Sequence, residues 1–144
     1  MKIYLAGPWF TEKADILEKY AYSVYEASNS KHTVFRPRTD GKDTPFLTFM
    51  GNLEAIVDCD LVIAQISEKD VGTAFEIGYA RALGKDIILV GFDKKDFERK
   101  TNLMLAFAAD QCITIDKLLK IFNDTIDYSV DTVDFENKNW ENIE

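Results

Sequence analysis

The sequence contains little cysteine, histidine or proline, and it lacks a long hydrophobic run. Its 144 residues include two cysteines, one histidine and three prolines. Cys59 and Cys112 are too few for a disulfide framework, and no metal-ligand spacing surrounds them. We therefore expect a reduced, cytoplasmic setting and no bound metal. The longest apolar runs are far shorter than the ~20 residues that span a bilayer, so no membrane association is expected.

An excess of basic residues is also absent. The net charge is −8, which argues against a groove that binds nucleic acid. Residues 124–144 hold seven acids and one base, so residues 1–123 are near neutral. We expect an α/β domain over residues 1–123 and an acidic tail over residues 124–144. The tail contains aromatic residues, which predicts that it docks on the domain or on a neighbouring subunit.

A glycine-rich phosphate loop is missing as well. The first loop, Ala6–Phe10, has neither a G-x-G-x-x-G run nor a G-K-[ST] ending. Dinucleotides and nucleoside triphosphates are therefore not expected as ligands, and no cofactor is expected. Trp9 and Phe10 either stack on a planar ring or cover the edge of the sheet, and the sequence favours neither alternative.

Short apolar segments alternate with helical patterns along the chain. We expect strands at residues 3–6, 33–35, 61–64, 86–90 and 113–115. We expect helices at residues 12–28, 46–57, from Asp70 to the glycine at 84, 102–109 and from 117 to 122, and a loop over 36–43. Strands that are apolar throughout predict a parallel sheet with helices on both faces. In this doubly wound fold, ligands bind at the carboxyl ends of the strands.

The helix that follows Asp70 is apolar almost all the way round, which predicts burial. Glu76 lies in its middle, and none of its helical neighbours is a cation. A buried acid without a local partner is costly and is typical of functional sites. The nearby helix N-terminus favours the anionic form, which is a competent nucleophile. The alternative is that the backbone or Tyr4 satisfies a purely structural carboxylate.

Other polar candidates have ordinary structural alternatives. Asp70 precedes the helix of Glu76 and can be a helix cap, although paired carboxylates are also typical of retaining glycosyl transfer. Asn102 can likewise cap a helix, and Asn52 can be a solvated position. His32 lies in a polar turn, and no catalytic role is expected for it.

Four separated motifs resemble the nucleoside 2-deoxyribosyltransferases. The stretch Gly72–Ala80 is similar to the signature of that family, and Ile3–Phe10, Asn52–Ala64 and Thr101–Met104 follow the same order. The resemblance covers roughly residues 2–115. It implies a flavodoxin-like domain with five parallel strands. It also implies a homo-oligomer built from dimers, commonly a hexamer.

The resemblance implies that 2-deoxyribose is transferred between a deoxynucleoside and a free nucleobase. Glu76 matches the nucleophile that attacks C1′, and Tyr4 matches a tyrosine that orients it. Asp70 matches an aspartate of the sugar and base region, which is a candidate for proton handling. Asn102 matches an asparagine that is donated across the subunit interface. The residues expected to bind substrate are Gly7, Trp9, Phe10, Arg38, Asn52, Gly72, Asn102 and Met104.

The chain departs from the family at one position. Many members carry an aspartate facing the base, where this chain has Asn52. An amide cannot give a proton to the leaving base, so Asn52 can only form hydrogen bonds. Proton transfer then falls to Asp70 or to a carboxylate of the tail.

Two other functions stay open. A related N-glycosidase would hydrolyse deoxynucleoside monophosphates, and Arg99 and Lys100 offer donors for a 5′-phosphate. The neutral Asn102 instead favours a 5′-hydroxyl group. A non-catalytic sensor of nucleosides or nucleotides could use the same pocket.

Overall fold

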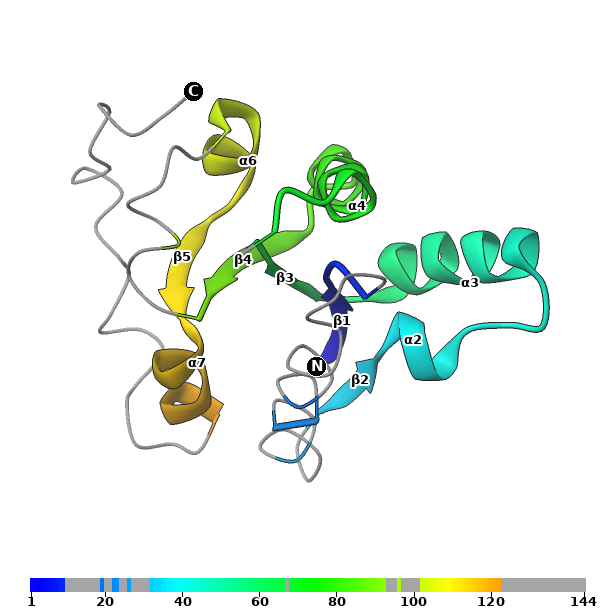
Figure 1. The fold of residues 1–144 in the computed structure, drawn as a ribbon, viewed down its shortest axis with the longest axis horizontal. Coiled ribbons are helices and arrows are strands. Elements are labelled where there is room, and N and C mark those ends of the chain that lie inside the picture. Colours follow the sequence, from blue (N-terminus) through cyan, green and yellow to red (C-terminus); the bar gives the residue numbers. More distant parts are fainter. Residues whose placement is uncertain are drawn as a thin grey trace.

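Five parallel strands form one sheet in the order β2-β1-β3-β4-β5 (Figure 1). The computed structural model describes residues 1–9, 19, 22–23, 26, 32–66, 68–92, 96 and 102–122. The strands are β1 (Lys2–Ala6), β2 (Thr33–Phe35), β3 (Leu61–Gln65), β4 (Asp86–Gly91) and β5 (Gln111–Thr114). Every neighbouring pair is parallel, which confirms the predicted fold class.

Helices cover both faces of this sheet. They are α2 (Pro37–Asp40), α3 (Pro45–Asp58), α4 (Val71–Ala82), α6 (Leu103–Ala108) and α7 (Ile115–Phe122). Residues of α3, α4 and α6 pack on one face, and residues of α7 pack on the other. No helix in these described ranges is long and apolar enough to cross a membrane. The predicted helix over residues 12–28, apart from positions 19, 22–23 and 26, and the tail beyond residue 123 lie outside the described residues.

Two predicted boundaries were wrong. The expected loop over residues 36–43 contains α2, which begins with Pro37. Asp40 Oδ2 accepts a hydrogen bond from Arg36 N at 2.7 Å and closes this single turn. Strand β5 spans Gln111–Thr114 and not residues 113–115, because Gln111 pairs with β4 and α7 begins directly at Ile115. Because Gln111 is polar, the apolar pattern did not indicate that the strand begins there.

The alternation of side chains along β1 determines what each face of the sheet receives. Ile3 and Leu5 point into the core beneath α7, together with Leu118. Tyr4 and Ala6 point into the opposite core beneath α3 and α4. Successive side chains of a strand lie on opposite faces, so this register places Tyr4 on the face that α4 covers.

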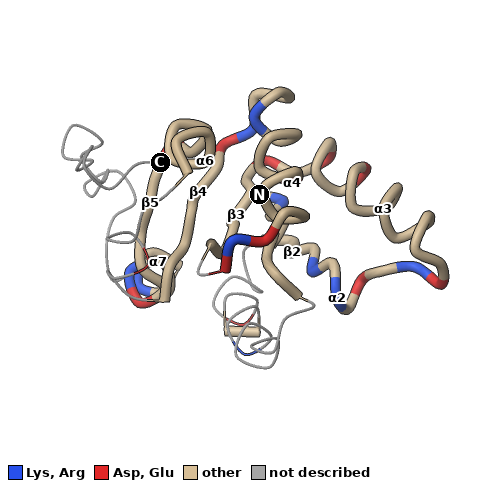
Figure 2. The backbone as a smooth tube through the Cα atoms, turned by 45° about the horizontal axis from the view of Figure 1, so that its top comes forward, with Lys and Arg blue, Asp and Glu red and all other residues tan. Residues whose placement is uncertain are grey.

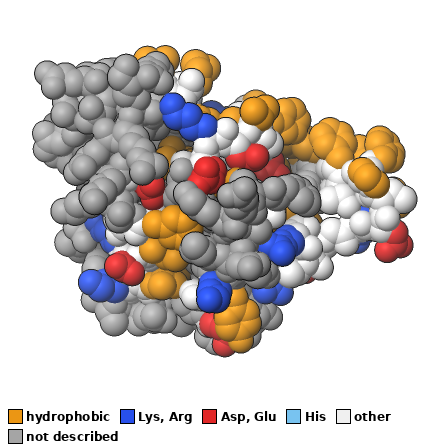
Figure 3. All heavy atoms as spheres, in the orientation of Figure 1, with side chains coloured by type: hydrophobic (Ala, Val, Ile, Leu, Met, Phe, Trp, Pro, Cys, Tyr) orange, Lys and Arg blue, Asp and Glu red, His pale blue; other side chains and the backbone are white. Residues whose placement is uncertain are grey.

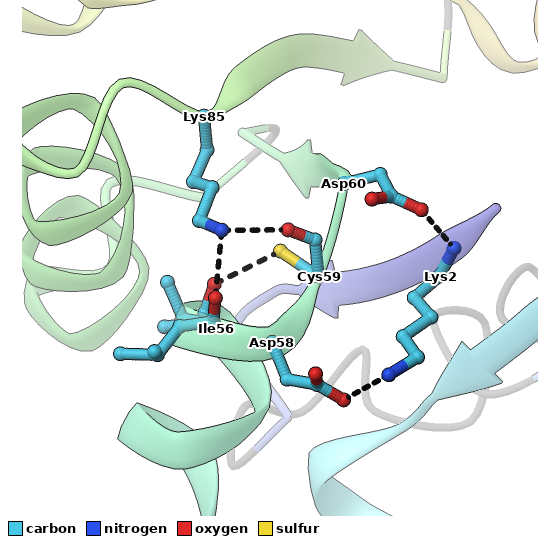
Figure 4. Close-up of polar contacts among 7 residues, drawn as sticks. Lys2, Ile56, Asp58, Cys59, Asp60 and Lys85 are labelled. Carbon is cyan, nitrogen blue, oxygen red and sulfur yellow. Dashed lines mark hydrogen bonds and ion pairs between the residues drawn. The ribbon is translucent and has the colours of Figure 1, made fainter.

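A polar network ties α3 to the strands at their amino-terminal edge (Figure 4). Lys85 Nζ donates hydrogen bonds to the carbonyl oxygens of Val57 at 2.7 Å and Cys59 at 2.8 Å. These carbonyls lie at the end of α3, where helix carbonyls lack partners within the helix. Lys2, by contrast, forms an exposed ion pair with Asp58 at 2.7 Å. Both cysteines are free thiols.

We expect Lys85→Met to lower the free energy of unfolding by about 1–2 kcal/mol, because two charge-assisted hydrogen bonds to the end of α3 are lost. Lys2→Met is the matched control, since it removes only a solvent-exposed ion pair and should have a much smaller effect. Urea unfolding followed by circular dichroism measures both. Equal losses for the two variants would contradict a special role for Lys85 at this helix end.

Candidate active site

A hydrogen bond between two distant segments defines the centre of the site. Tyr4 of β1 is fully buried, and its hydroxyl donates to Oε1 of Glu76 at 2.6 Å. Glu76 lies in the second turn of α4 and follows Phe75 directly. The sequence showed no cation beside Glu76 on its own helix, and in the structure its hydrogen-bond partner is Tyr4 of the sheet. The bond leaves Oε2 of Glu76 free of this donor.

Burial dominates the electrostatics of Glu76. It raises the pKa of this carboxyl group to about 7, and the negative charge of Asp70 acts in the same direction. The hydrogen bond from Tyr4 opposes both effects. The sequence-based expectation that the helix N-terminus favours the anion is therefore outweighed. Burial also raises the pKa of Tyr4 far above its usual range, so Tyr4 remains a hydrogen-bond donor at neutral pH.

Asp70 caps α4. Its Oδ2 accepts hydrogen bonds from Thr73 N at 2.6 Å and from Thr73 Oγ1 at 2.8 Å. A Cβ atom at Gly72 would lie 3.1 Å from this oxygen, so a glycine suits the tight cap. The capping role that the sequence offered is thus observed, and the same carboxylate lies close enough to influence Glu76.

The expectation that α4 is buried all round was wrong. Only Thr73, Ile77 and Ala80 are buried in this helix. Val71 is 83% exposed and Phe75 is 52% exposed. One face of α4 packs on the sheet, while the other presents apolar side chains that no described residue covers.

Asn52 lies on the side of α3 that faces α4. It follows Phe49 by one turn, and the rings of Phe49 and Phe75 are 6.3 Å apart. It precedes Ile56 by one turn, and Ile56 packs in the same core as Tyr4. The Oδ1 atom of Asn52 is buried, and it has no hydrogen-bond partner among the described residues.

The loop after β1 places Trp9 against one face of the sheet. Trp9 is 6% exposed and packs in the core beneath α7, on the face opposite Tyr4. Its ring therefore covers the sheet in this structure, and its contact with a ligand stays a prediction. Gly7 lies under the Trp9 ring, because a Cβ atom there would approach the indole to 3.2 Å. Phe10 lies outside the described residues.

The remaining predicted residues lie on the surface. Arg38 is exposed in α2, directly after β2. Asn102 caps α6 by accepting a hydrogen bond from Met104 N at 2.9 Å. Met104 is 72% exposed. Within the described ranges, no hydrogen bond joins Asn102 or Met104 to Glu76, whereas Tyr4 bonds Glu76 and Asp70 influences its charge.

Sequence reasoning missed two neighbours of the site. Phe35 stacks on Tyr4 with ring centroids 5.6 Å apart. Thr73 is buried and completes the cap of Asp70. The contact of Phe35 follows from the register of β1 and β2, in which Tyr4 lies opposite Phe35, and residue types alone do not show that register.

No group of three or more histidine, cysteine, aspartate or glutamate side chains within the described part of the chain could hold a metal ion. The arrangement instead offers a partly desolvated carboxylate, oriented by a neutral phenol and accompanied by a second acid. Such a group can attack an electrophilic carbon or stabilise a developing positive charge.

The strand order 2-1-3-4-5 places the chain among the flavodoxin-like doubly wound α/β proteins. A profile of the nucleoside 2-deoxyribosyltransferase family matches residues 3–104, so the chain belongs to that family. The family that the four motifs indicated is thereby confirmed. No curated protein sequence matches the chain.

Solved structures give the same picture of the fold. The chain is similar to a 2-deoxyribosyltransferase from Bacillus psychrosaccharolyticus, with 28% identity, a TM-score of 0.69 and coverage of 89% of this chain and 92% of that one. A 2-desoxiribosyltransferase from Leishmania mexicana has 22% identity, a TM-score of 0.63 and coverage of 85% and 97%. A CMP N-glycosidase from Clostridium botulinum has 22% identity, a TM-score of 0.63 and coverage of 88% and 100%.

We expect Glu76→Gln to stabilise the protein in alkaline but not in acidic solution. The pKa of Glu76 rises from 4.5 to about 7 on folding, so ionisation opposes folding as the pH increases through this range. The gain above the folded pKa is at most about 3 kcal/mol. Urea unfolding at about pH 5 and about pH 8 measures it, with the exposed Glu54→Gln as control. A gain that does not change with pH would refute buried ionisation at Glu76.

Proposed function

We propose that this chain transfers 2-deoxyribose between nucleobases by a retaining, two-step mechanism. The observation that carries the proposal is the partly buried Tyr4–Glu76 hydrogen bond beside Asp70, in a member of this family. A glycosidic bond breaks through a cationic, oxocarbenium-like state, which an adjacent carboxylate stabilises and then traps.

Glu76 is the proposed nucleophile. Tyr4 holds Oε1, so Oε2 is the oxygen left to attack C1′ of the deoxynucleoside. The new C1′–O bond forms as the C1′–N bond breaks, and the base leaves with the bonding electrons. A ring nitrogen of the incoming base then attacks C1′ from the opposite side, which releases the Glu76 carboxylate and restores the original configuration.

Asp70 is proposed to serve the sugar and base region. Thr73 occupies its Oδ2 with two donors, which fixes the carboxylate and leaves Oδ1 for a substrate hydrogen bond.

The pKa of about 7 at Glu76 implies that a large share of the nucleophile is ionised at neutral pH. Exchange should therefore weaken as the pH falls below this value.

The alternative reaction is hydrolysis of a deoxynucleoside monophosphate. The fold of the Clostridium botulinum CMP N-glycosidase keeps this alternative open. Arg99 and Lys100, which could bind a 5′-phosphate, lie outside the described residues. A non-catalytic sensor is the third candidate, and the oriented, partly desolvated carboxylate favours an enzyme over it.

Incubation with a deoxynucleoside or its 5′-monophosphate, each with a second free base, separates the three candidates. We expect a new deoxynucleoside, measured by liquid chromatography, and a loss of about a thousandfold or more in rate for Glu76→Ala. The exposed Glu54→Ala is the control for the loss of a carboxylate. Release of free deoxyribose or deoxyribose 5-phosphate alone would identify a hydrolase, and absence of any product from either donor would identify a sensor. Exchange that survives Glu76→Ala would refute the covalent mechanism.

We also propose that the active form is a homo-oligomer built from dimers. Large apolar side chains remain exposed on three neighbouring helices, and they gather along the upper rim of Figure 3. Figure 2 shows that few residues along α3 are charged. These residues are Phe46, Leu47, Phe49 and Met50 of α3, Val71 and Phe75 of α4, and Leu103, Met104 and Phe107 of α6. An apolar surface of this kind is typical of subunit interfaces.

Asn102 lies at the start of this surface on α6, and we propose that it completes the site of a neighbouring subunit. Mixing inactive Glu76→Ala chains with weakened Asn102→Ala chains tests this arrangement. Random pairing gives about a quarter of the sites both wild-type residues, so activity should return in the mixture. If Asn102 served its own subunit, the mixture would show only the average of its two components.

A further inference from the structure

We propose that Asn52 is a specificity-determining residue that binds the departing base through its amide and gives it no proton. The inference rests on the proposed transfer reaction and names its donor class. The preferred donors are nucleosides of pyrimidine-2,4-diones, whose bases are stable as anions. Donors whose base leaves only after protonation, such as adenine and cytosine nucleosides, are disfavoured.

The first observation is the unsatisfied Oδ1 atom of Asn52. This oxygen is buried and accepts no hydrogen bond within the described part of the chain. A buried acceptor without a donor has lost its hydrogen bonds to water without replacement, which is unfavourable, so such atoms are rare in folded proteins. A ligand that brings an N–H group to Oδ1 recovers that free energy. The amide therefore provides an acceptor that the described residues do not use.

The second observation is the position of Asn52. It lies between Phe49, whose ring approaches Phe75, and Ile56, which shares a core with Tyr4. Glu76 directly follows Phe75 and bonds Tyr4, so the same two helices and the same strand surround the amide and the nucleophile. A nucleoside whose C1′ meets Glu76 must extend its base away from that carboxylate. Since α3 packs beside α4, the Asn52 side of α3 is one of the surfaces toward which the base can extend.

The third observation concerns which acidic side chains could give a proton to the departing base. Among the described residues, Asp70 is the one acid that contributes to the raised pKa of Glu76, and Thr73 binds its Oδ2 through two donors. At position 52 a side-chain amide occupies the place where an acid could stand, and an amide has no proton to transfer at neutral pH. A base held by Asn52 receives no proton from that side chain, and in the proposed step it leaves with the electrons of the C1′–N bond and without a proton.

A pyrimidine-2,4-dione suits these conditions. On departure its negative charge spreads from N1 onto the two carbonyl oxygens, while N3 keeps its hydrogen. The N3–H group donates to Oδ1 of Asn52, and the amide Nδ2 donates to an adjacent carbonyl oxygen that gains charge. Both bonds use the side-by-side acceptor and donor of the amide. Water protonates N1 after release and becomes hydroxide, and the proton that the acceptor base loses when it bonds to C1′ neutralises this hydroxide.

The test is a leaving-group series. The donors are 2′-deoxyuridine, its 5-fluoro derivative, 2′-deoxycytidine and 2′-deoxyadenosine, each with one fixed acceptor base, and kcat/KM is measured. We expect the wild-type rate to rise steeply with the acidity of the departing base, so the 5-fluoro donor is fastest and 2′-deoxycytidine, whose base is the weakest acid of the four, is slowest. An unassisted leaving group gives this steep dependence, whereas a protein acid would flatten it.

Asn52→Asp and Asn52→Ala form the matched pair of variants. The carboxylic acid introduced by Asn52→Asp should increase kcat/KM for 2′-deoxyadenosine about tenfold, more at about pH 5 than at about pH 8. Asn52→Ala should slow the dione donors and give no such gain. Urea unfolding of both variants confirms that they fold, and a folded Asn52→Ala protein with unchanged donor preference would overturn the proposal.

A shallow leaving-group dependence in the wild type would also overturn it and would assign the proton to another acid, with Asp70 first. Failure of this inference is distinguishable from failure of the proposed function. Wild-type protein that neither exchanges nor hydrolyses any donor refutes the function itself, whereas active protein with no leaving-group dependence refutes only the role of Asn52.

Discussion

The desolvation of one carboxylate is the constraint on which the rest of the site depends. Glu76 is held away from water on α4, and its charge is tolerated because the Tyr4 hydroxyl donates to it at 2.6 Å. That donor reaches it only because the alternation along β1 directs Tyr4 toward α4 and sends Ile3 and Leu5 to the other face. A shift of one residue in the register of β1 would reverse this arrangement and remove the partner of the nucleophile. The core of the domain and the chemistry of the site therefore depend on the same register.

The outer face of α4 links the site to assembly. Its inner face buries Ile77 and Ala80 against the sheet, while Val71 and Phe75 remain exposed. Phe75 meets Phe49 of α3 on this surface and directly precedes Glu76 in the chain. A subunit that covers the surface would exclude water from the neighbourhood of the carboxylate, and transfer in place of hydrolysis requires such exclusion. The same apolar side chains would then serve association and protect the covalent intermediate.

Much of the fold could be predicted because strand burial leaves a strong pattern in the sequence. Continuous apolar runs such as residues 61–64 identify the central strands, and the order of segments then limits the topology to a doubly wound sheet. The short helix α2 could not be predicted in this way, because a hydrogen bond from Arg36 N to Asp40 Oδ2 closes it and no apolar pattern marks it. The expected burial of α4 was wrong for a different reason. Apolar composition shows that a surface needs a partner, but it does not show whether that partner is the same chain.

For the candidate site, the sequence indicates single residues but not how they meet. The lack of a helical cation makes Glu76 a candidate, but no local signal could show that Trp9 packs beneath α7, because that depends on how the chain turns after β1. The residue type at position 52 affects the ionisation of Glu76. Asp70 already contributes to the raised pKa of Glu76. An aspartate at position 52 would add a third carboxyl group on the side of α3 that faces α4, and its negative charge would raise that pKa further. A neutral amide avoids this repulsion, so a larger share of Glu76 is ionised at neutral pH than with an aspartate, while the amide itself has no proton to give to a leaving base.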